Sequence, residues 1–596
     1  MTTGERQVSA ATQQMQQNLA KIENLSQRLV DALAKKRLPN PALEGPGPDL
    51  YMSAAHAWMK ELSDKPELVL ESQVKYWGEA MTHYVGATHA LATAGFVPPD
   101  DPGPQDRRFS NPLWNTHPYF NFVKQQYQIA SQAMEEATEN LPGLDPVDQK
   151  RLQYFTRQLV DMMAPTNFLA TNPDALERAV ATEGASLVQG LENLVRDVEE
   201  HNGDLLVTLA DRHAFEVGGN LATSEGEVIY RTRLFEMIQY TPKTEQVYRT
   251  PLVIFPPWIN KFYILDLKQQ NSFINYAVEQ GFTVFVVSWK NPDQGFADVG
   301  FEHYIDSYMD AIEQVKTITG VAKVNAIGYC IAGTTLALTL ALMKARKDTS
   351  INSATFFTTL TDFSDQGEFT AFLQDDFVDG LEKQCKADGV LSSYFMSRTF
   401  SFLRANDLVW RPAIRSYMMG EAPPAFDLLY WNGDATNLPG KMAIQYLRGL
   451  CQQNRFADTA FELKGEKLKL SDVNVPLMAI ACETDHIAPW AASFGGIAKM
   501  GAREKTFVLA QSGHIAGIVN PPSKKKYGHY TSAAPIKEAE DWLEQAEFHE
   551  GTWWGRWAEW LAEKSGRKVA ARTPGDASHP SLGPAPGEYV KETFVL

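Results

Sequence analysis

Short apolar runs separated by helical stretches are the feature that most constrains how this chain can fold. These runs cover residues 252–255, 283–287, 324–327, 354–360, 476–481 and 506–510, after a stretch rich in β-branched and aromatic residues at 227–240. A strand buried on both faces of a sheet is apolar along its whole length, and parallel neighbours are joined by crossover helices. The sequence therefore predicts an α/β fold with a mostly parallel sheet.

The part of the sequence before the apolar runs has a different secondary-structure pattern from the part that contains them. Residues 1–215 have helical periodicity and little strand character, so we expect a helical N-terminal region, with the catalytic domain over 216–596. Apolar positions recur at three- and four-residue spacing over 11–37, which predicts an amphipathic helix; the proline-rich stretch 38–50 is typical of a linker.

More than a hundred residues separate the fourth and fifth predicted core strands. A structureless loop of that length is not plausible in a compact domain, so we expect residues 361–470 to form a cap subdomain over the active-site edge of the sheet. The C-terminus from about 573 is rich in Pro, Gly, Ser and Ala, and we expect it to be extended or poorly ordered, apart from its last apolar residues.

Charge, apolar runs and cysteine spacing argue against several classes of protein. A formal net charge of −17 over 596 residues argues against a nucleic-acid partner, and we expect the Lys524–Lys526 run to be a solvated loop. The sequence shows neither a signal peptide nor an apolar run long enough for a transmembrane segment. Its four cysteines lack paired Cys-x-x-Cys spacing, so no metal site is expected, and their scarcity fits the reduced cytoplasm.

The third predicted core strand leads directly into Gly328-Tyr329-Cys330-Ile331-Ala332-Gly333, and a helix is predicted over 334–344. This is the nucleophile-elbow pattern, with Cys in place of Ser and Ala332 in place of the usual final Gly. Cys330 is the candidate nucleophile at a helix N-terminus, where the dipole favours a thiolate, and the backbone amide of Ile331 is a candidate oxyanion-hole donor. A buried structural cysteine is the alternative, but the strand–turn–helix context favours catalysis.

In this fold the acid and then the histidine follow the nucleophile in chain order. The fifth core strand runs into Asp485 and the sixth into His514, both at carboxyl ends of strands, where catalytic groups of open α/β sheets collect. Asp485 and His514 are therefore the candidate acid and base. The sequence leaves open whether Asp485 orients His514 or acts directly on an incoming hydroxyl.

Neighbouring residues offer alternatives. His486 is a possible base but precedes the sixth strand, so a substrate contact is the more economical role; Glu483 is expected to be solvated and Cys482 to pack in the core. A second oxyanion-hole donor belongs in the loop after the first core strand, Pro256-Pro257-Trp258-Ile259-Asn260-Lys261, and the Ile259 amide is our candidate, although the loop lacks an HGGG motif.

A cysteine nucleophile points to acyl transfer. With an acyl-CoA substrate, a thioester would be exchanged for a thioester in a nearly isoenergetic step, and the acyl-cysteine would stay activated for attack by an alcohol. A serine would form a more stable oxygen ester. His514 can take the thiol proton and later activate the acceptor hydroxyl.

The chain resembles the class I polyhydroxyalkanoate synthases. The resemblance rests on the 256–261 loop, the Cys330 box, and the segments 111–115, 288–292, 403–410, 431–439, 485–490, 512–517 and 552–554. The most specific of these is Trp431-Asn432-Gly433-Asp434-Ala435-Thr436-Asn437-Leu438-Pro439. Ala332 departs from the family, which usually has Gly there, so elbow packing or monomer preference could differ.

The resemblance implies a Cys330/Asp485/His514 triad that polymerises (R)-3-hydroxyacyl-CoA, with (R)-3-hydroxybutyryl-CoA as the expected monomer. CoA would be released as a product, and no cofactor would be needed. It further implies a homodimer on the surface of cytoplasmic polyester granules, in contact with the growing polyester chain and granule-associated proteins. The alternatives are a thioesterase or polyester depolymerase on the same fold, and a non-catalytic granule-associated protein.

Overall fold

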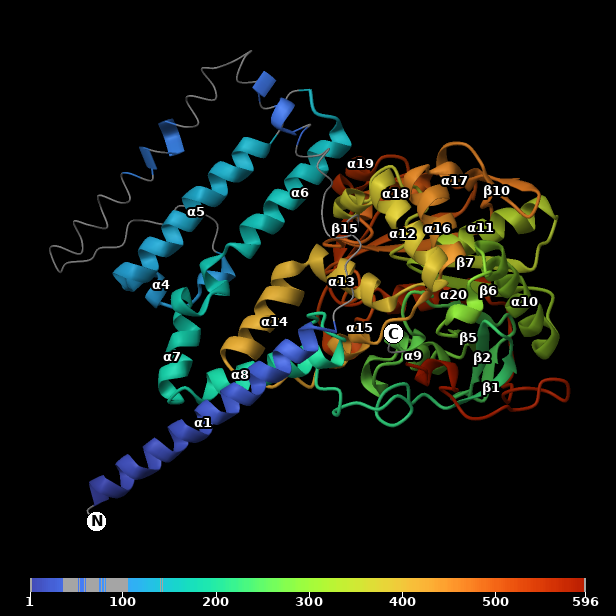
Figure 1. Ribbon diagram of the computed structural model, residues 1–596. Coiled ribbons are helices and arrows are strands. Elements are labelled where there is room, and N and C mark those ends of the chain that lie inside the picture. Colours follow the sequence, from blue (N-terminus) through green and yellow to red (C-terminus); the bar gives the residue numbers. More distant parts are fainter. Residues whose placement is uncertain are drawn as a thin grey trace. The chain divides into compact units, whose positions relative to one another are not determined.

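The computed structural model describes residues 3–35, scattered positions between 52 and 81, and residues 106–593 except 140 and 142. The predicted linker at 38–50 lies outside the described residues. The chain divides into two compact units (Figure 1), one of Met1–Asp211 with Arg398–Pro424 and the other of Arg212–Ser397 with Ala425–Leu596. Residues 398–424, which fall inside the range expected for the cap, thus group with the N-terminal residues.

The N-terminal unit is helical. Its main helices are α1 (Thr3–Leu33), α4 (Leu113–Thr116), α5 (Pro118–Thr138), α6 (Pro146–Met162), α7 (Pro173–Ala181) and α8 (Ala185–Glu200). The helical segment 406–418 adds η9 (Asn406–Trp410), α14 (Arg411–Ala413) and η10 (Ile414–Met418). Helix α6 begins where Asp145 accepts a hydrogen bond from the Val147 amide and Pro146 occupies the first helical position, a favoured N-terminal arrangement.

Helix α1 has the amphipathic character predicted for 11–37, although it begins and ends earlier. Leu25 and Ala32 are buried on one side, whereas Leu19 and Val30 are exposed. Ion pairs join α1 to α8: Arg28 to Glu199 at 2.6 Å and Lys21 to Glu192 at 2.9 Å. A narrow apolar stripe and exposed ion pairs therefore hold the two helices together.

The second unit is built on a ten-stranded sheet in the order β1-β2-β5-β4-β6-β7-β12-β13-β14-β15. The strands are β1 (Gly226–Arg231), β2 (Phe235–Tyr240), β4 (Leu252–Phe255), β5 (Val284–Trp289), β6 (Val324–Tyr329), β7 (Ile351–Phe357), β12 (Leu477–Cys482), β13 (Lys505–Ala510), β14 (His529–Thr531) and β15 (Glu547–His549). The run from β5 to β13 is parallel, and antiparallel strands extend it at both ends. The predicted α/β fold with a mostly parallel sheet is confirmed.

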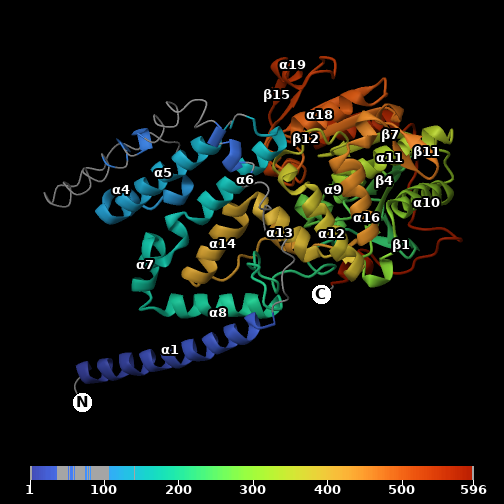
Figure 2. The same cartoon turned by 45° about the horizontal axis from the view of Figure 1, so that its top comes forward.

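Helices cover both faces of this sheet (Figures 1 and 2), which explains why its central strands are apolar throughout. On one face lie α10 (Phe301–Thr319) and α11 (Ile331–Ala345), and Phe255 of β4 stacks on Tyr308 of α10 with ring centroids 3.9 Å apart. Ile254 points the other way, into a core that includes Phe273 of α9 (Phe273–Glu279) and Trp557 of α20 (Trp554–Lys564).

The insertion between β7 and β12 is mainly helical. Its elements are η8 (Gly367–Phe372), α12 (Asp375–Asp388), β8 (Val390–Leu391), α13 (Ser393–Leu403), α15 (Asp427–Gly433), β9 (Leu438–Pro439), α16 (Gly440–Tyr446), η11 (Leu447–Gln452), α17 (Arg455–Asp458), β10 (Phe461–Leu463), β11 (Glu466–Leu468) and η12 (Leu470–Asp472). The two-residue strands β8 and β9 pair antiparallel. This pairing joins the chain just before α13 to the chain just after α15.

The C-terminal region is ordered by its contacts with the sheet edge. After α18 (Trp490–Lys499), α19 (Ala539–Glu544) and α20, strand β16 (Lys568–Ala570) pairs with β3 (Gln246–Tyr248). Farther on, the Leu582 amide donates to the Val228 carbonyl at 2.7 Å, and the Val228 amide donates to Gly583 at 2.8 Å. The tail thus covers the open edge of β1, so of the two expectations for the C-terminus, extended or poorly ordered, the described residues 573–593 fit the first.

Candidate active site

The carboxyl ends of β6, β12 and β13 bring Cys330, Asp485 and His514 together. Cys330 directly follows β6, while Asp485 and His514 lie in the loops that leave β12 and β13. The Asp485 and His514 side chains are buried, and Cys330 is partly buried. Residues distant in sequence meet here because parallel strands end at the same edge of the sheet.

Cys330 lies in a strained turn. Its backbone has φ 55° and ψ −125°, an unfavourable region for a residue with a side chain, where a strained conformation costs of the order of 1–3 kcal/mol. The Cys330 amide donates to the Phe357 carbonyl at 2.7 Å, which ties the turn to β7. Ile331 follows as the first residue of α11, where backbone amides have no acceptor within the helix. This is the elbow geometry that the sequence predicts.

Two glycines allow the strand and helix of the elbow to approach. A Cβ on Gly328 would lie 2.6 Å from the Gly333 Cα, and a Cβ on Gly333 would lie 2.0 Å from the Thr359 Oγ1. The elbow pattern has its small residues at Gly328 and Ala332, but the closest approach to Gly328 is made by Gly333. Ala332 is fully buried, and its carbonyl accepts a hydrogen bond from the Tyr308 hydroxyl at 3.0 Å.

Asp485 holds the His514 ring. One carboxylate oxygen, Oδ2, lies 2.6 Å from His514 Nδ1, and the other accepts the Ile487 and Ala488 amides, each at 2.9 Å. Tyr329 adds a second constraint, because its ring stacks on the imidazole and its hydroxyl donates to the His514 carbonyl at 3.2 Å. These contacts occupy Nδ1 and leave Nε2 as the ring nitrogen available for proton transfer.

The surroundings of His514 favour a protonated ring. Burial alone lowers the pKa of His514, but the Asp485 carboxylate and the hydrogen-bonded Cys330 sulfur raise it to about 10. The imidazolium form of His514 is therefore stabilised by the Asp485 carboxylate and the neighbouring Cys330 sulfur.

Comparison with known proteins identifies the family. Residues 105–277 match the family model described as the poly-beta-hydroxybutyrate polymerase (PhaC) N-terminus, and residues 250–521 match the alpha/beta hydrolase fold. The chain is 41% identical over 546 residues to the poly(3-hydroxyalkanoate) polymerase of Methylorubrum extorquens, covering 90% of this chain and 88% of that protein. The chain belongs to the poly(3-hydroxyalkanoate) polymerase family.

Other poly(3-hydroxyalkanoate) polymerases agree with this assignment. The subunit PhaC of Rhizobium meliloti is 39% identical over 89% of this chain and 86% of its own length. The subunit PhaC of Cupriavidus necator is 39% identical over 82% of this chain and 83% of its own length. The predicted family resemblance is confirmed, and the protein is an acyltransferase-type polymerase on an α/β-hydrolase fold.

The remaining residues of this polymerase that the sequence raised as site candidates differ in burial. Cys482 is fully buried at the end of β12, and burial raises the pKa of its thiol well above the ordinary value. Glu483 is exposed and His486 is partly buried. Ile259 is buried in the loop after β4, and its carbonyl accepts the Thr436 amide at 3.3 Å. Thr436 carried no assigned role in the sequence interpretation, although it lies within the most specific family segment.

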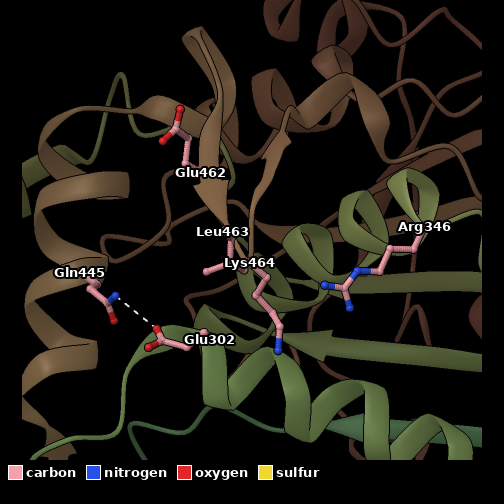
Figure 3. A pocket seen from close by; sticks show the side chains of 6 residues that line it. All are labelled: Glu302, Arg346, Gln445, Glu462, Leu463 and Lys464. Atoms are coloured by element: carbon pink, nitrogen blue, oxygen red, sulfur yellow. Dashed lines mark hydrogen bonds between the residues drawn. The ribbon is translucent and has the colours of Figure 1, made fainter.

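A surface pocket of about 500 Å³ lies elsewhere in the same unit (Figure 3). It is lined by Glu302, Arg346, Gln445, Glu462, Leu463 and Lys464. Gln445 donates a hydrogen bond to Glu302 at 3.3 Å, and Lys464 is ion-paired with Asp306. None of the lining residues is a predicted site residue.

Within the described part of the chain, no group of three or more His, Cys, Asp or Glu residues is arranged to hold a metal ion. Nor does any described helix combine the length and the apolar character needed to cross a membrane.

The raised pKa of His514 predicts a pH dependence of stability. The ring has a pKa near 6.5 when free and about 10 in the folded protein, so its stabilising contribution is complete below pH 6.5 and disappears as the pH rises through 10. We expect the thermal unfolding midpoint to fall over this window, and to fall less in His514→Gln. An equal fall in both proteins, measured by calorimetry, would contradict this assignment.

Proposed function

We propose that this enzyme polymerises (R)-3-hydroxyacyl-CoA, with (R)-3-hydroxybutyryl-CoA as its preferred monomer, through an acyl thioester on Cys330. The observation that carries the proposal is the position of Cys330 in the elbow, hydrogen-bonded to a histidine that Asp485 holds. The names of the relatives support the product class, since they are poly(3-hydroxyalkanoate) polymerases.

The first half-reaction transfers the acyl group to the enzyme. The Cys330 thiol proton passes to His514 Nε2, which gives the imidazolium that Asp485 stabilises, and the sulfur attacks the thioester carbonyl. The amides of Ile331 and Ile259 would donate hydrogen bonds to the oxyanion of the tetrahedral intermediate. The bond to the CoA sulfur then breaks, and CoA leaves with the proton from His514. One thioester replaces another, so little free energy is lost.

The second half-reaction forms the ester. His514 takes the proton from the hydroxyl of a bound monomer or chain end, and the hydroxyl oxygen attacks the acyl-Cys330 carbonyl. The carbon–sulfur bond to Cys330 breaks, the sulfur recovers the proton, and the chain is one unit longer. Asp485 orients the ring in both steps, a role supported by the burial of its carboxylate and its full set of hydrogen bonds. The scheme needs no cofactor.

We also propose cytoplasmic location at the surface of the polyester product, as a homodimer together with granule-associated proteins. The N-terminal unit supports this location because it exposes apolar side chains, among them Val30 at 60% and Val180 at 80%. His486, partly buried next to Asp485, would contact substrate. The name of the Rhizobium meliloti relative, which describes a polymerase subunit, supports assembly with further chains.

One assay separates this function from its alternatives. Purified protein is incubated with (R)-3-hydroxybutyryl-CoA while free CoA, free hydroxy acid and insoluble polymer are measured. We expect one CoA for each ester unit recovered in polymer. CoA release with only free acid would show a thioesterase, and no release would show a non-catalytic protein; either result would contradict the proposal.

A further inference from the structure

The loop Pro256–Lys261 is held by two separate sets of contacts, and this arrangement bears on the oxyanion hole of the proposed function. In the first set, the Trp258 indole Nε1 donates to Thr335 Oγ1 at 3.2 Å. The Thr335 hydroxyl in turn donates to the Ile331 carbonyl at 3.0 Å, within the helix that begins at the nucleophile. The loop is therefore fixed relative to Cys330.

The second set of contacts comes from the segment Trp431–Asn437, which hydrogen-bonds to the backbone of the same loop. Thr436 donates twice, from its hydroxyl to the Trp258 carbonyl at 3.0 Å and from its amide to the Ile259 carbonyl at 3.3 Å. An ion pair of 2.7 Å joins Lys261, which is buried, to Asp434, which is partly buried. Together with the two hydrogen bonds from Thr436, this ion pair ties the loop to the segment at neighbouring positions.

The Thr436 hydroxyl acts on one particular peptide group. The Trp258 carbonyl and the Ile259 amide belong to the same planar trans peptide, in which C=O and N–H point in opposite directions. A hydrogen bond that draws the Trp258 carbonyl toward Thr436 therefore turns the Ile259 N–H away from it. Thr436 is itself 2% exposed, so water cannot readily substitute for its hydroxyl.

We infer that Thr436 is a positioning residue that aims the Ile259 amide at the developing oxyanion. The inference rests on the proposed acyl transfer at Cys330 and on the Ile259 amide as donor. Thr436 touches neither the sulfur nor the substrate in this account; it acts through the peptide that it holds. Asn437 extends the same segment, donating to the Pro292 carbonyl at 3.2 Å and accepting the Ser393 amide at 2.8 Å, which anchors the segment to the loop after β5 and to the first residue of α13.

The test compares Thr436→Val with Thr436→Ser. Valine keeps the shape and removes the hydroxyl, whereas serine keeps the donor. Loss of an oxyanion-hole donor lowers kcat by about 10²–10³-fold. If the Ile259 amide is only turned out of line, we expect a smaller fall in the acylation rate, of about 10–100-fold. We expect Thr436→Val to lower the rate of Cys330 acylation from (R)-3-hydroxybutyryl-CoA by that factor with KM nearly unchanged, and Thr436→Ser to restore most of it.

Alkylation of Cys330 by iodoacetamide separates a positioning role from general damage, because that displacement forms no oxyanion. We expect Thr436→Val to be alkylated at the wild-type rate. Thr339→Val is the matched control: Thr339 is also fully buried and donates to a backbone carbonyl, that of Thr335, at 2.8 Å. We expect this control to acylate normally.

The inference is overturned if Thr436→Val acylates as fast as wild type, if acylation and alkylation fall together, or if serine fails to rescue. Failure of the proposed function has a different signature, since wild-type protein itself would then form no acyl-Cys330. The two failures are therefore distinguishable in the same experiment.

Discussion

Replacing Cys330 with alanine is expected to abolish CoA release and polymer formation together, with a fall in rate of about 10⁴-fold or more. Cys330 supplies the sulfur that carries the acyl group in both half-reactions, and no other thiol can take its place. Burial raises the pKa of the Cys385 thiol to about 12, and raises those of Cys451 and Cys482 further above their ordinary value. The rate is measured as CoA released per enzyme from (R)-3-hydroxybutyryl-CoA.

The control for this substitution is Cys385→Ala. It removes a buried thiol from α12 and leaves the elbow intact, so we expect activity close to that of wild type. Thermal unfolding of Cys330→Ala should show a folded protein, because the substitution removes one partly buried sulfur atom. Polymer formed by folded Cys330→Ala at the wild-type rate would eliminate Cys330 as the nucleophile.

Asp485→Asn is expected to lower the rate of CoA release by about 10³–10⁴-fold, as loss of the orienting carboxylate does in comparable triads. Asparagine can keep accepting the Ile487 and Ala488 amides, but its NH₂ group would face His514 Nδ1 where a carboxylate oxygen now lies at 2.6 Å. The ring would then carry its proton on Nε2 and could not accept one from Cys330. The pKa of His514 should also fall, because the carboxylate that raises it is gone.

Single-turnover kinetics decide between the two possible roles of Asp485. If it orients His514, Asp485→Asn slows both the first CoA release and subsequent chain growth. If Asp485→Asn released the first CoA at the normal rate and lost only chain growth, Asp485 would act directly on the incoming hydroxyl. That result would contradict the orienting role proposed here. The pKa of the ring, followed by NMR in both proteins, provides the independent check.

The strands and the elbow could be predicted because their determinants are local. Continuous apolar runs mark buried parallel strands, and small residues around Cys330 mark a tight turn. Chain order then predicted Asp485 and His514, which the structure places 2.6 Å apart. The predicted strand stretch 227–240 contains a hairpin of two strands, β1 and β2, and the other boundaries differ by a few residues.

Features that depend on contacts distant in sequence could not be predicted. Residues 398–424 group with the N-terminal helices, and no pattern in their own sequence indicates this. The C-terminal tail is rich in turn-forming residues, yet it is ordered by backbone hydrogen bonds to Val228. Likewise, Thr436 has no recognisable catalytic pattern, because its importance comes from one carbonyl 178 positions earlier in the chain.

The most direct test of the account is to find the acyl group on the enzyme. A stoichiometric amount of (R)-3-hydroxybutyryl-CoA is mixed with the protein, the reaction is quenched in acid, and the digested peptides are analysed by mass spectrometry. We expect a hydroxyacyl adduct on Cys330 that hydroxylamine removes, because hydroxylamine cleaves thioesters. An adduct on another residue, or polymer and CoA formed with Cys330 unmodified throughout the time course, would contradict it.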